Sequence, residues 1–230
     1  MSEVVETHDH SKLEQCQETG NIRPKRSLPE ILCPQTLGDL TLRRPIIDRL
    51  RKMVETKSVM NMVFYGTVGT GKTSATRLFA DCGEVTVFGR GFSQWDGSLV
   101  KNVDFVRTDL KRNLSSIGYK IVVLDGADLV PRAAQQALPS VIDEMYHCRF
   151  LFIVNHLAKI IPEIRSRLMP ICFDVKPSDR EEVQKRLIDR YEGKLAEHGI
   201  EHDKRRLIEI VGTNYPDLRS IAQKVDFEFA

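Results

Sequence analysis

The sequence has few of the features that crosslink a small protein or anchor one in a membrane. Its five cysteines are scattered, odd in number and never spaced as CxxC: Cys16, Cys33, Cys82, Cys148 and Cys172. This pattern argues against a disulfide framework and a zinc site, and it is typical of inert thiols in a reducing compartment. No apolar run approaches the roughly 20 residues that span a bilayer, and the N-terminus lacks an apolar signal core. We therefore expect a protein of the cytoplasm, or of the nucleus in a eukaryote, with no membrane partner.

A strong net charge is also missing. The formal net charge is +2, so bulk electrostatics does not indicate nucleic acid, and any DNA-facing surface has to be local. A chain of 230 residues with 41% hydrophobic content can bury a core without disulfides or metal. Its length suits one medium domain, with or without a small appended one.

Three regions differ in character. Residues 1–27 are polar and hold too little apolar surface to pack, which predicts a disordered tail. Residues 28–177 alternate strand-like and helix-like stretches, the pattern of a parallel sheet sandwiched by helices. Residues 178–230 show no strand pattern and predict a small all-α domain. The expected fold class is therefore α/β with a helical domain appended.

The expected elements follow from apolar periodicity and from helix signals. Strands are predicted at 60–65, 85–88, 121–124, 150–154 and 171–175. Helices are predicted from residue 72, over 104–114 and 132–146, and over 203–211 and 216–225. Pro139 should kink or break the helix over 132–146. Ser178-Asp179-Arg180-Glu181 has the sequence of a capping box and predicts the start of a long charged helix.

A glycine-rich motif follows the first expected strand. It fits GxxxxGK[ST] at every fixed position and reads Gly66-Thr67-Val68-Gly69-Thr70-Gly71-Lys72-Thr73. Glycines let backbone N–H groups wrap phosphates, and the N-terminus of the next helix adds the positive end of its dipole. Lys72 would reach the β- and γ-phosphates, and the Thr73 hydroxyl would bind Mg²⁺. We therefore predict that this P-loop, with the adjoining Ser74, binds ATP and Mg²⁺.

An acidic residue ends the strand expected at 121–124. Asp125 is predicted to be the Walker B aspartate, which holds the magnesium shell beside Thr73. Many P-loop ATPases place a glutamate directly after this aspartate to polarise the attacking water, but Gly126 stands here. Asp128, three positions beyond Asp125, fits a cap or turn residue better than a catalytic one.

Six stretches, in order along residues 30–228, resemble motifs of the AAA+ ATPase subunits of sliding-clamp loaders. These loaders include the replication factor C small subunits and the T-even phage loader, and the motif resembled by Val103–Arg107 is one seen in phage loaders. In this chain the six stretches are Pro34–Leu40 (entry segment), Val103–Arg107 and Ala134–Leu138 (helix motifs), Phe152–Asn155 with Lys159–Pro162 (sensor 1), Arg165–Leu168 (the SRC motif, with Leu168 in place of cysteine) and Tyr215–Arg219 (sensor 2).

The resemblance implies a role for several residues. Asn155 would orient the attacking water or the γ-phosphate, and Arg219 would contact the γ-phosphate from the helical lid. Arg167 would be an arginine finger inserted into a neighbouring subunit's site, unless it forms a surface salt bridge. Lys101, Arg107 and Lys111 would follow a DNA phosphate backbone, although a solvated helix face fits them nearly as well.

The chain departs from the family pattern at three points. Gly126 predicts slow or absent hydrolysis at its own site. Pro139 stands where relatives usually carry a basic residue. Loader subunits normally continue into a helical collar domain, whereas this sequence ends at Ala230.

Three functions fit the sequence. The leading hypothesis is a clamp-loader-like ATPase subunit that assembles with other AAA+ subunits in a ring or spiral and opens a sliding clamp on primer–template DNA. The alternative is an assembly or regulatory module that binds ATP without turning it over. A helicase-loader type of AAA+ protein fits the core motifs, but it does not fit the stretches at Val103–Arg107 and Arg165–Leu168.

Overall fold

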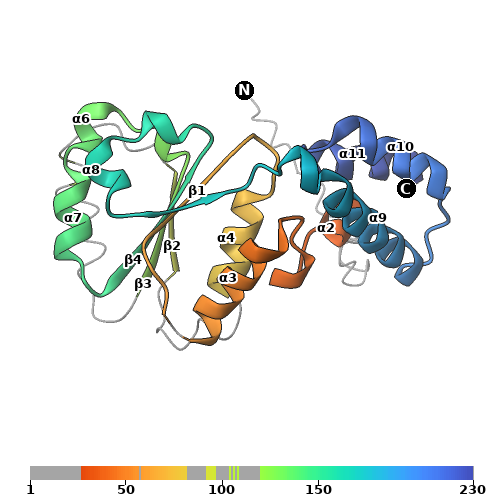
Figure 1. Ribbon diagram of the computed structural model, residues 1–230, viewed down its shortest axis with the longest axis horizontal. Coiled ribbons are helices and arrows are strands. Elements are labelled where there is room, and N and C mark those ends of the chain that lie inside the picture. Colours follow the sequence, from red (N-terminus) through yellow and green to blue (C-terminus); the bar gives the residue numbers. More distant parts are fainter. Residues whose placement is uncertain are drawn as a thin grey trace, which may run out of the picture.

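The computed structural model describes residues 27–56, 58–81, 92–96, 104, 106, 108 and 120–229. Five parallel strands form one sheet in the order β2-β3-β4-β1-β5. The strands are β1 (Met62–Tyr65), β2 (Phe92–Asp96), β3 (Lys120–Asp125), β4 (Cys148–Val154) and β5 (Met169–Cys172). In Figure 1 the helices α6, α7 and α8 lie on one side of the sheet, and α3 and α4 lie on the other.

Alternation along the central strands explains why both faces of the sheet are covered. On β4, Phe150 and Phe152 pack towards α6 (Arg132–Gln135), α7 (Leu138–Glu144) and α8 (Pro162–Arg165). Leu151 and Ile153 of the same strand pack towards α3 (Arg44–Glu55) and α4 (Lys72–Asp81). Because neighbouring side chains of a strand point to opposite faces, one apolar run supplies two cores. The predicted parallel sheet between helices is confirmed.

Four of the five predicted strands occur, with shifted ends. β1, β3 and β4 overlap the predicted stretches closely, and β5 ends earlier than expected, at Cys172. The strand predicted at 85–88 and most of the helix predicted at 104–114 lie outside the described residues, as does the tail over residues 1–26. β2 was not predicted, because its sequence FSQWD lacks the apolar run used to recognise the other strands.

Pro139 breaks a helix, as predicted. The stretch 132–146 forms two helices, α6 and α7, and Pro139 lies in the first turn of α7. Proline is accepted there because the first N–H groups of a helix have no partner within it.

The capping box predicted at Ser178–Glu181 is wrong. Residues Pro177–Asp179 form a short 3-10 turn, η7, and helix α9 (Arg180–Glu197) follows it. The Ser178 hydroxyl donates to the carboxylate of Asp179 at 3.0 Å, and no side chain caps the helix. The helix has Asp179 at its N-cap, so Ser178 lies one residue before the position that a capping serine would occupy.

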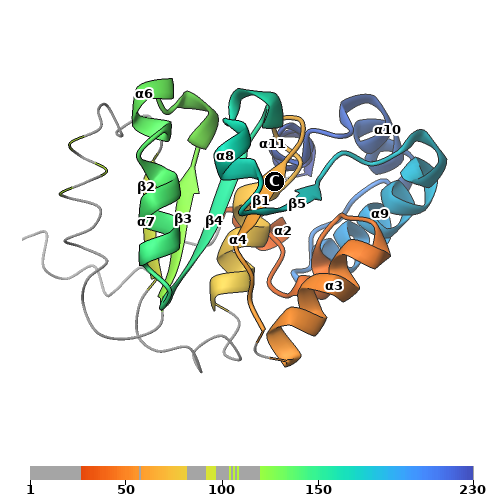
Figure 2. The same cartoon turned by 60° about the vertical axis from the view of Figure 1, so that its left-hand side comes forward.

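The C-terminal helices share a separate core. α9, α10 (Lys204–Asn214) and α11 (Leu218–Phe229) pack around Leu195, Leu207 and Ile221, which are fully buried. The short helix α2 (Leu28–Leu32) joins this cluster through Leu28 and Leu32, although it lies at the other end of the sequence. Figures 1 and 2 both place α2 beside the C-terminal helices. The division of the chain at residue 177 remains a prediction.

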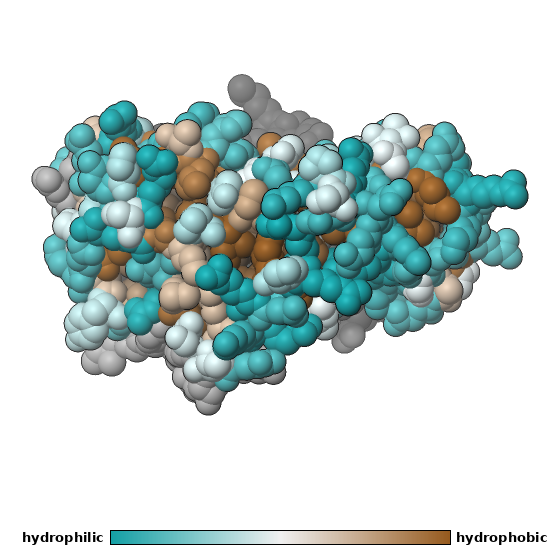
Figure 3. All heavy atoms as spheres, viewed as in Figure 1, coloured by the Kyte–Doolittle hydropathy of each residue, from teal (hydrophilic) through white to brown (hydrophobic). Residues whose placement is uncertain are grey.

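The surface is mainly polar. On the face shown in Figure 3, hydrophilic side chains cover α3 and much of α9, and hydrophobic ones gather near β1 in the middle of the molecule. None of the helices in the described part of the chain has both the length and the apolar character needed to cross a bilayer.

Candidate nucleotide-binding site

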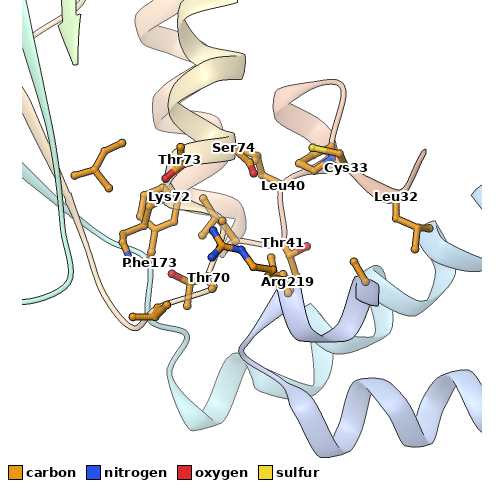
Figure 4. A pocket seen from close by; sticks show the side chains of 18 of the residues that line it. Leu32, Cys33, Leu40, Thr41, Thr70, Lys72, Thr73, Ser74, Phe173 and Arg219 are labelled. Carbon is orange, nitrogen blue, oxygen red and sulfur yellow. The ribbon is translucent and has the colours of Figure 1, made fainter. Parts of the chain in front are cut away.

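A cavity of about 500 Å³ opens at the carboxyl ends of the strands, between the sheet and helix α11. The loop between β1 and α4, the ends of β3 and β4, the segment from α2 to Leu42, and the first turns of α11 line it. Crevices at the carboxyl ends of parallel strands are the usual ligand sites of open α/β sheets. Figure 4 shows the labelled side chains of this cavity.

The P-loop motif occupies the floor of the cavity. Its glycines Gly66, Gly69 and Gly71 have φ angles of 141°, 80° and 86°. Residues other than glycine rarely adopt these angles. This backbone path carries the chain from β1 into α4, which begins at Lys72. Val68, Thr70 and Ser74 also line the cavity, whereas Gly66 and Thr67 do not.

Lys72 is folded back onto its own loop. Its Nζ donates to the carbonyl oxygens of Gly66 at 2.7 Å and Thr67 at 2.8 Å. Burial lowers the pKa of this amine, while the carboxylates of Asp174, Asp125 and Asp128 act against that shift. The ammonium group therefore has hydrogen-bond partners that a phosphate oxygen could replace.

Thr73 and Asp125 meet across the cavity. The Thr73 hydroxyl donates to Asp125 Oδ2 at 3.1 Å, which joins the start of α4 to the end of β3. A hydroxyl and a carboxylate are the hard oxygen ligands that Mg²⁺ prefers, and Mg²⁺ completes its shell with waters and phosphate. Within the described residues no group of three or more His, Cys, Asp or Glu side chains could hold a metal ion. The pair therefore fits Mg²⁺ held jointly with a nucleotide.

Asn155 lies at the end of β4, within the same cavity. Its backbone N–H and that of His156 both donate to Asp128 Oδ2, each at 3.3 Å. Asp128 belongs to the 3-10 turn η5 (Ala127–Leu129), so it is a turn residue, as predicted. Gly126 begins this turn with φ 67° and ψ 32°.

Helix α11 closes the cavity. Leu218 N donates to the carbonyl oxygen of Gly69 at 2.9 Å, and the Asp217 carboxylate accepts from the N–H groups of Arg219 and Ser220 at 3.1 Å. Figure 4 shows the Arg219 side chain reaching from α11 into the cavity, towards Thr70 and Lys72. The tertiary fold thus brings Arg219 to the P-loop, about 150 residues away in the chain.

Arg167 does not line this cavity. Its guanidinium forms a bidentate pair with Asp143 of α7, at 2.9 Å from Nε to Oδ1 and 2.7 Å from Nη2 to Oδ2. Nη1 donates to the Glu163 carbonyl oxygen at 2.7 Å. The pairing lowers the pKa of the Asp143 carboxyl and raises that of the guanidinium. Lys101, Arg107 and Lys111, the residues predicted to contact DNA, lie outside the described residues.

Sequence reasoning missed part of the cavity wall. Leu32, Cys33, Leu40 and Thr41 line it from the N-terminal segment, as Figure 4 shows, and Tyr191 lines it from α9. Asp174 was also missed, although its Oδ1 accepts from the P-loop N–H of Thr67 at 2.7 Å. No motif marks these residues. The only signal is the position of Asp174 shortly after a strand end, where polar residues of parallel sheets gather.

No protein-family model matches the sequence. The replication factor C small subunit of Saccharolobus solfataricus is 33% identical over 197 residues, which cover 81% of this chain and 56% of that protein. Replication factor C subunit 3 of Saccharomyces cerevisiae is 31% identical, over 72% of this chain and 50% of that protein. The chain thus spans about half the length of these relatives.

Solved structures agree on the fold. The Thermotoga maritima RuvB Holliday junction branch migration motor superposes with a TM-score of 0.66, over 86% of this chain and 64% of that one, at 16% sequence identity. At that identity the likeness concerns the fold alone. The sequence matches and the fold together identify this chain as carrying a AAA+ module of the replication factor C small-subunit type.

Proposed function

We propose that the chain binds ATP with Mg²⁺ and acts in DNA replication as a subunit of a clamp-loader assembly. In that role it would join other AAA+ subunits in a ring or spiral and help to open a sliding clamp on primer–template DNA. One observation carries the proposal. Lys72, the Thr73–Asp125 pair, Asn155 and Arg219 come from four parts of the chain and line a single cavity.

Each of these residues has a task that its geometry supports. The P-loop backbone and Lys72 would hold the phosphates, with Lys72 leaving its two carbonyl partners for phosphate oxygens. Thr73 and Asp125 would hold Mg²⁺, which neutralises phosphate charge when bound. Asn155 and Arg219 would contact the γ-phosphate from opposite sides of the cavity, so the angle of α11 would depend on the nucleotide.

Turnover at this site should be slow. The group that activates water is commonly worth about 10²–10⁴ in rate, and glycine at position 126 cannot accept a proton. This observation favours the second candidate function, a module that binds ATP and signals the bound state without hydrolysing it. The two candidates share the same cavity and differ in the chemical step.

Nucleotide binding is the first test. Lys72→Ala should weaken MgATP binding roughly 10- to 100-fold, because it removes charge-assisted hydrogen bonds to the phosphates. Lys52→Ala, which changes an exposed lysine of α3, is the matched control and should bind like the wild type. The measurement is a calorimetric titration with MgATP. Equal affinities for the wild type and Lys72→Ala would contradict the proposal.

The loader role needs its own measurement. ATPase activity should rise when primed DNA and a cognate clamp are both added. Tight MgATP binding with negligible turnover in all conditions would instead support the regulatory module.

A further inference from the structure

Asp128 has an unusual environment for a turn residue. Its side chain lines the nucleotide cavity, yet only 9% of the residue is exposed. Oδ2 accepts two backbone N–H groups, those of Asn155 and His156. Oδ1 is buried and has no hydrogen-bond partner among the described residues. A buried carboxylate oxygen without a partner is costly, so its presence calls for a donor from outside the chain.

The turn that carries Asp128 depends on Gly126. The left-handed backbone of Gly126 turns the chain sharply away from β3, and Leu129 N then donates to the Gly126 carbonyl oxygen at 2.8 Å. This turn directs Asp128 back against the end of β4. Gly126 therefore stands in place of the expected glutamate and also begins the turn that carries a second cavity-lining carboxylate, Asp128.

The contact with β4 acts on Asn155 through its backbone. Asn155 is the first residue after β4, and both N–H groups that follow the strand point at the same carboxylate oxygen. This contact sets the direction in which the chain leaves the sheet. Asn155 lines the cavity, so Asp128 fixes the backbone of a cavity-lining residue.

We propose that Asp128 is the second acidic residue of the nucleotide site. Through Oδ2 it positions Asn155, and through Oδ1 it accepts a hydrogen bond from a water molecule that enters with Mg²⁺ and the γ-phosphate. The inference rests on the proposed ATP site, and it makes Asp128 a positioning residue that distinguishes ATP from ADP.

The test compares affinities for MgATP and MgADP by calorimetry. Asp128→Asn keeps the shape and one acceptor oxygen, but replaces the other oxygen with a donor. We expect the MgATP dissociation constant to rise about tenfold while that for MgADP changes less than about twofold, since one charge-assisted hydrogen bond is lost only with the third phosphate.

Asp39→Asn is the matched control. Asp39 also holds two backbone N–H groups through one oxygen, those of Gln35 at 3.1 Å and Thr36 at 2.8 Å, but it does not line the cavity. This variant should leave the ratio of the two affinities unchanged. Equal losses for ATP and ADP in Asp128→Asn, or the same change of ratio in Asp39→Asn, would show a purely structural role.

A measurement on the wild type covers the case in which Asp128→Asn fails to fold. Amide hydrogen exchange at Asn155 and His156 should slow with MgATP and stay unchanged with MgADP. Equal exchange with both nucleotides would overturn the inference and leave ATP binding intact. A wild type that binds neither nucleotide would refute the proposed function itself, and with it the role of Asp128.

Discussion

At the scale of single residues, Gly126 has two effects that the sequence shows only in part. It removes the glutamate that activates water in many P-loop ATPases, and it adopts a left-handed backbone that other residues avoid. A glutamate placed here would therefore meet backbone strain and would also disturb the turn around Asp128. Gly126→Glu alone is therefore not expected to restore the usual arrangement of a catalytic glutamate after the Walker B aspartate.

Gly126→Ala and Gly126→Glu should both lower the free energy of unfolding, by about 1–2 kcal/mol, because the left-handed conformation is strained for any residue with a Cβ. Urea unfolding measures the change. Gly193→Ala is the control, since Gly193 lies inside helix α9 and an added Cβ would meet nothing within 4 Å apart from its chain neighbours and the backbone of its own helix. That variant should gain about 0.5–1 kcal/mol. A Gly126→Ala protein as stable as the wild type would refute the argument from strain.

At the scale of elements, the P-loop and helix α11 form one unit. The Gly69 carbonyl oxygen accepts from Leu218 N, and a Cβ on Gly69 would collide with the Asp217 carboxylate at the start of α11. The P-loop therefore contacts helix α11, which carries Arg219, at Gly69. There is no room for a side chain at this position. A change of loop conformation on nucleotide binding would reach α11 directly.

Gly69→Ala should raise the MgATP dissociation constant at least about tenfold, because the added methyl group displaces α11 and strains the loop at φ 80°. Fluorescence titration with a labelled ATP analogue provides the measurement. Gly38→Ala is the control, because an added Cβ there meets only ordinary contacts of 3.6 Å or longer. Unchanged affinity in Gly69→Ala would separate the loop from α11.

At the scale of the whole molecule, the two arginines with proposed roles at a nucleotide lie in different places. Arg219 points into the chain's own cavity, whereas Arg167 lies on the surface and pairs with Asp143. A surface salt bridge and an arginine finger were the two interpretations of Arg167 from the sequence. A finger role would require this exposed pair to open when a neighbouring subunit offers its nucleotide, and exposed pairs cost little to break.

Arg167→Ala should leave the MgATP affinity of the isolated chain unchanged, because Arg167 does not line the chain's own nucleotide cavity. If Arg167 acts on the nucleotide of a neighbouring subunit, the same change should reduce hydrolysis in an assembled complex. Arg219→Ala should weaken MgATP binding in the isolated chain. Titration calorimetry on the free chain and steady-state ATPase assays on the assembly separate the two effects. Loss of affinity in the isolated Arg167→Ala chain would contradict this division.

The sequence alone was sufficient to predict the central strands β1, β3 and β4, and it places the proposed phosphate and magnesium residues in two short motifs. Each depends on a short run of consecutive residues with its own backbone preferences and apolar pattern. These features can be identified without knowing which other segments the run contacts in the fold. The sequence therefore predicts Lys72, Thr73 and Asp125 as site residues, and the structure adds the contact between Thr73 and Asp125.

Only the tertiary structure decided which distant residues meet. It places α2 in the core of the C-terminal helices, Asp128 against the end of β4, and Asp174 on the P-loop. These contacts join segments far apart in the chain, and they depend on how the strands order themselves and how α11 packs on the loop. A periodic pattern specifies which face of an element is buried, but it does not specify which other element covers that face.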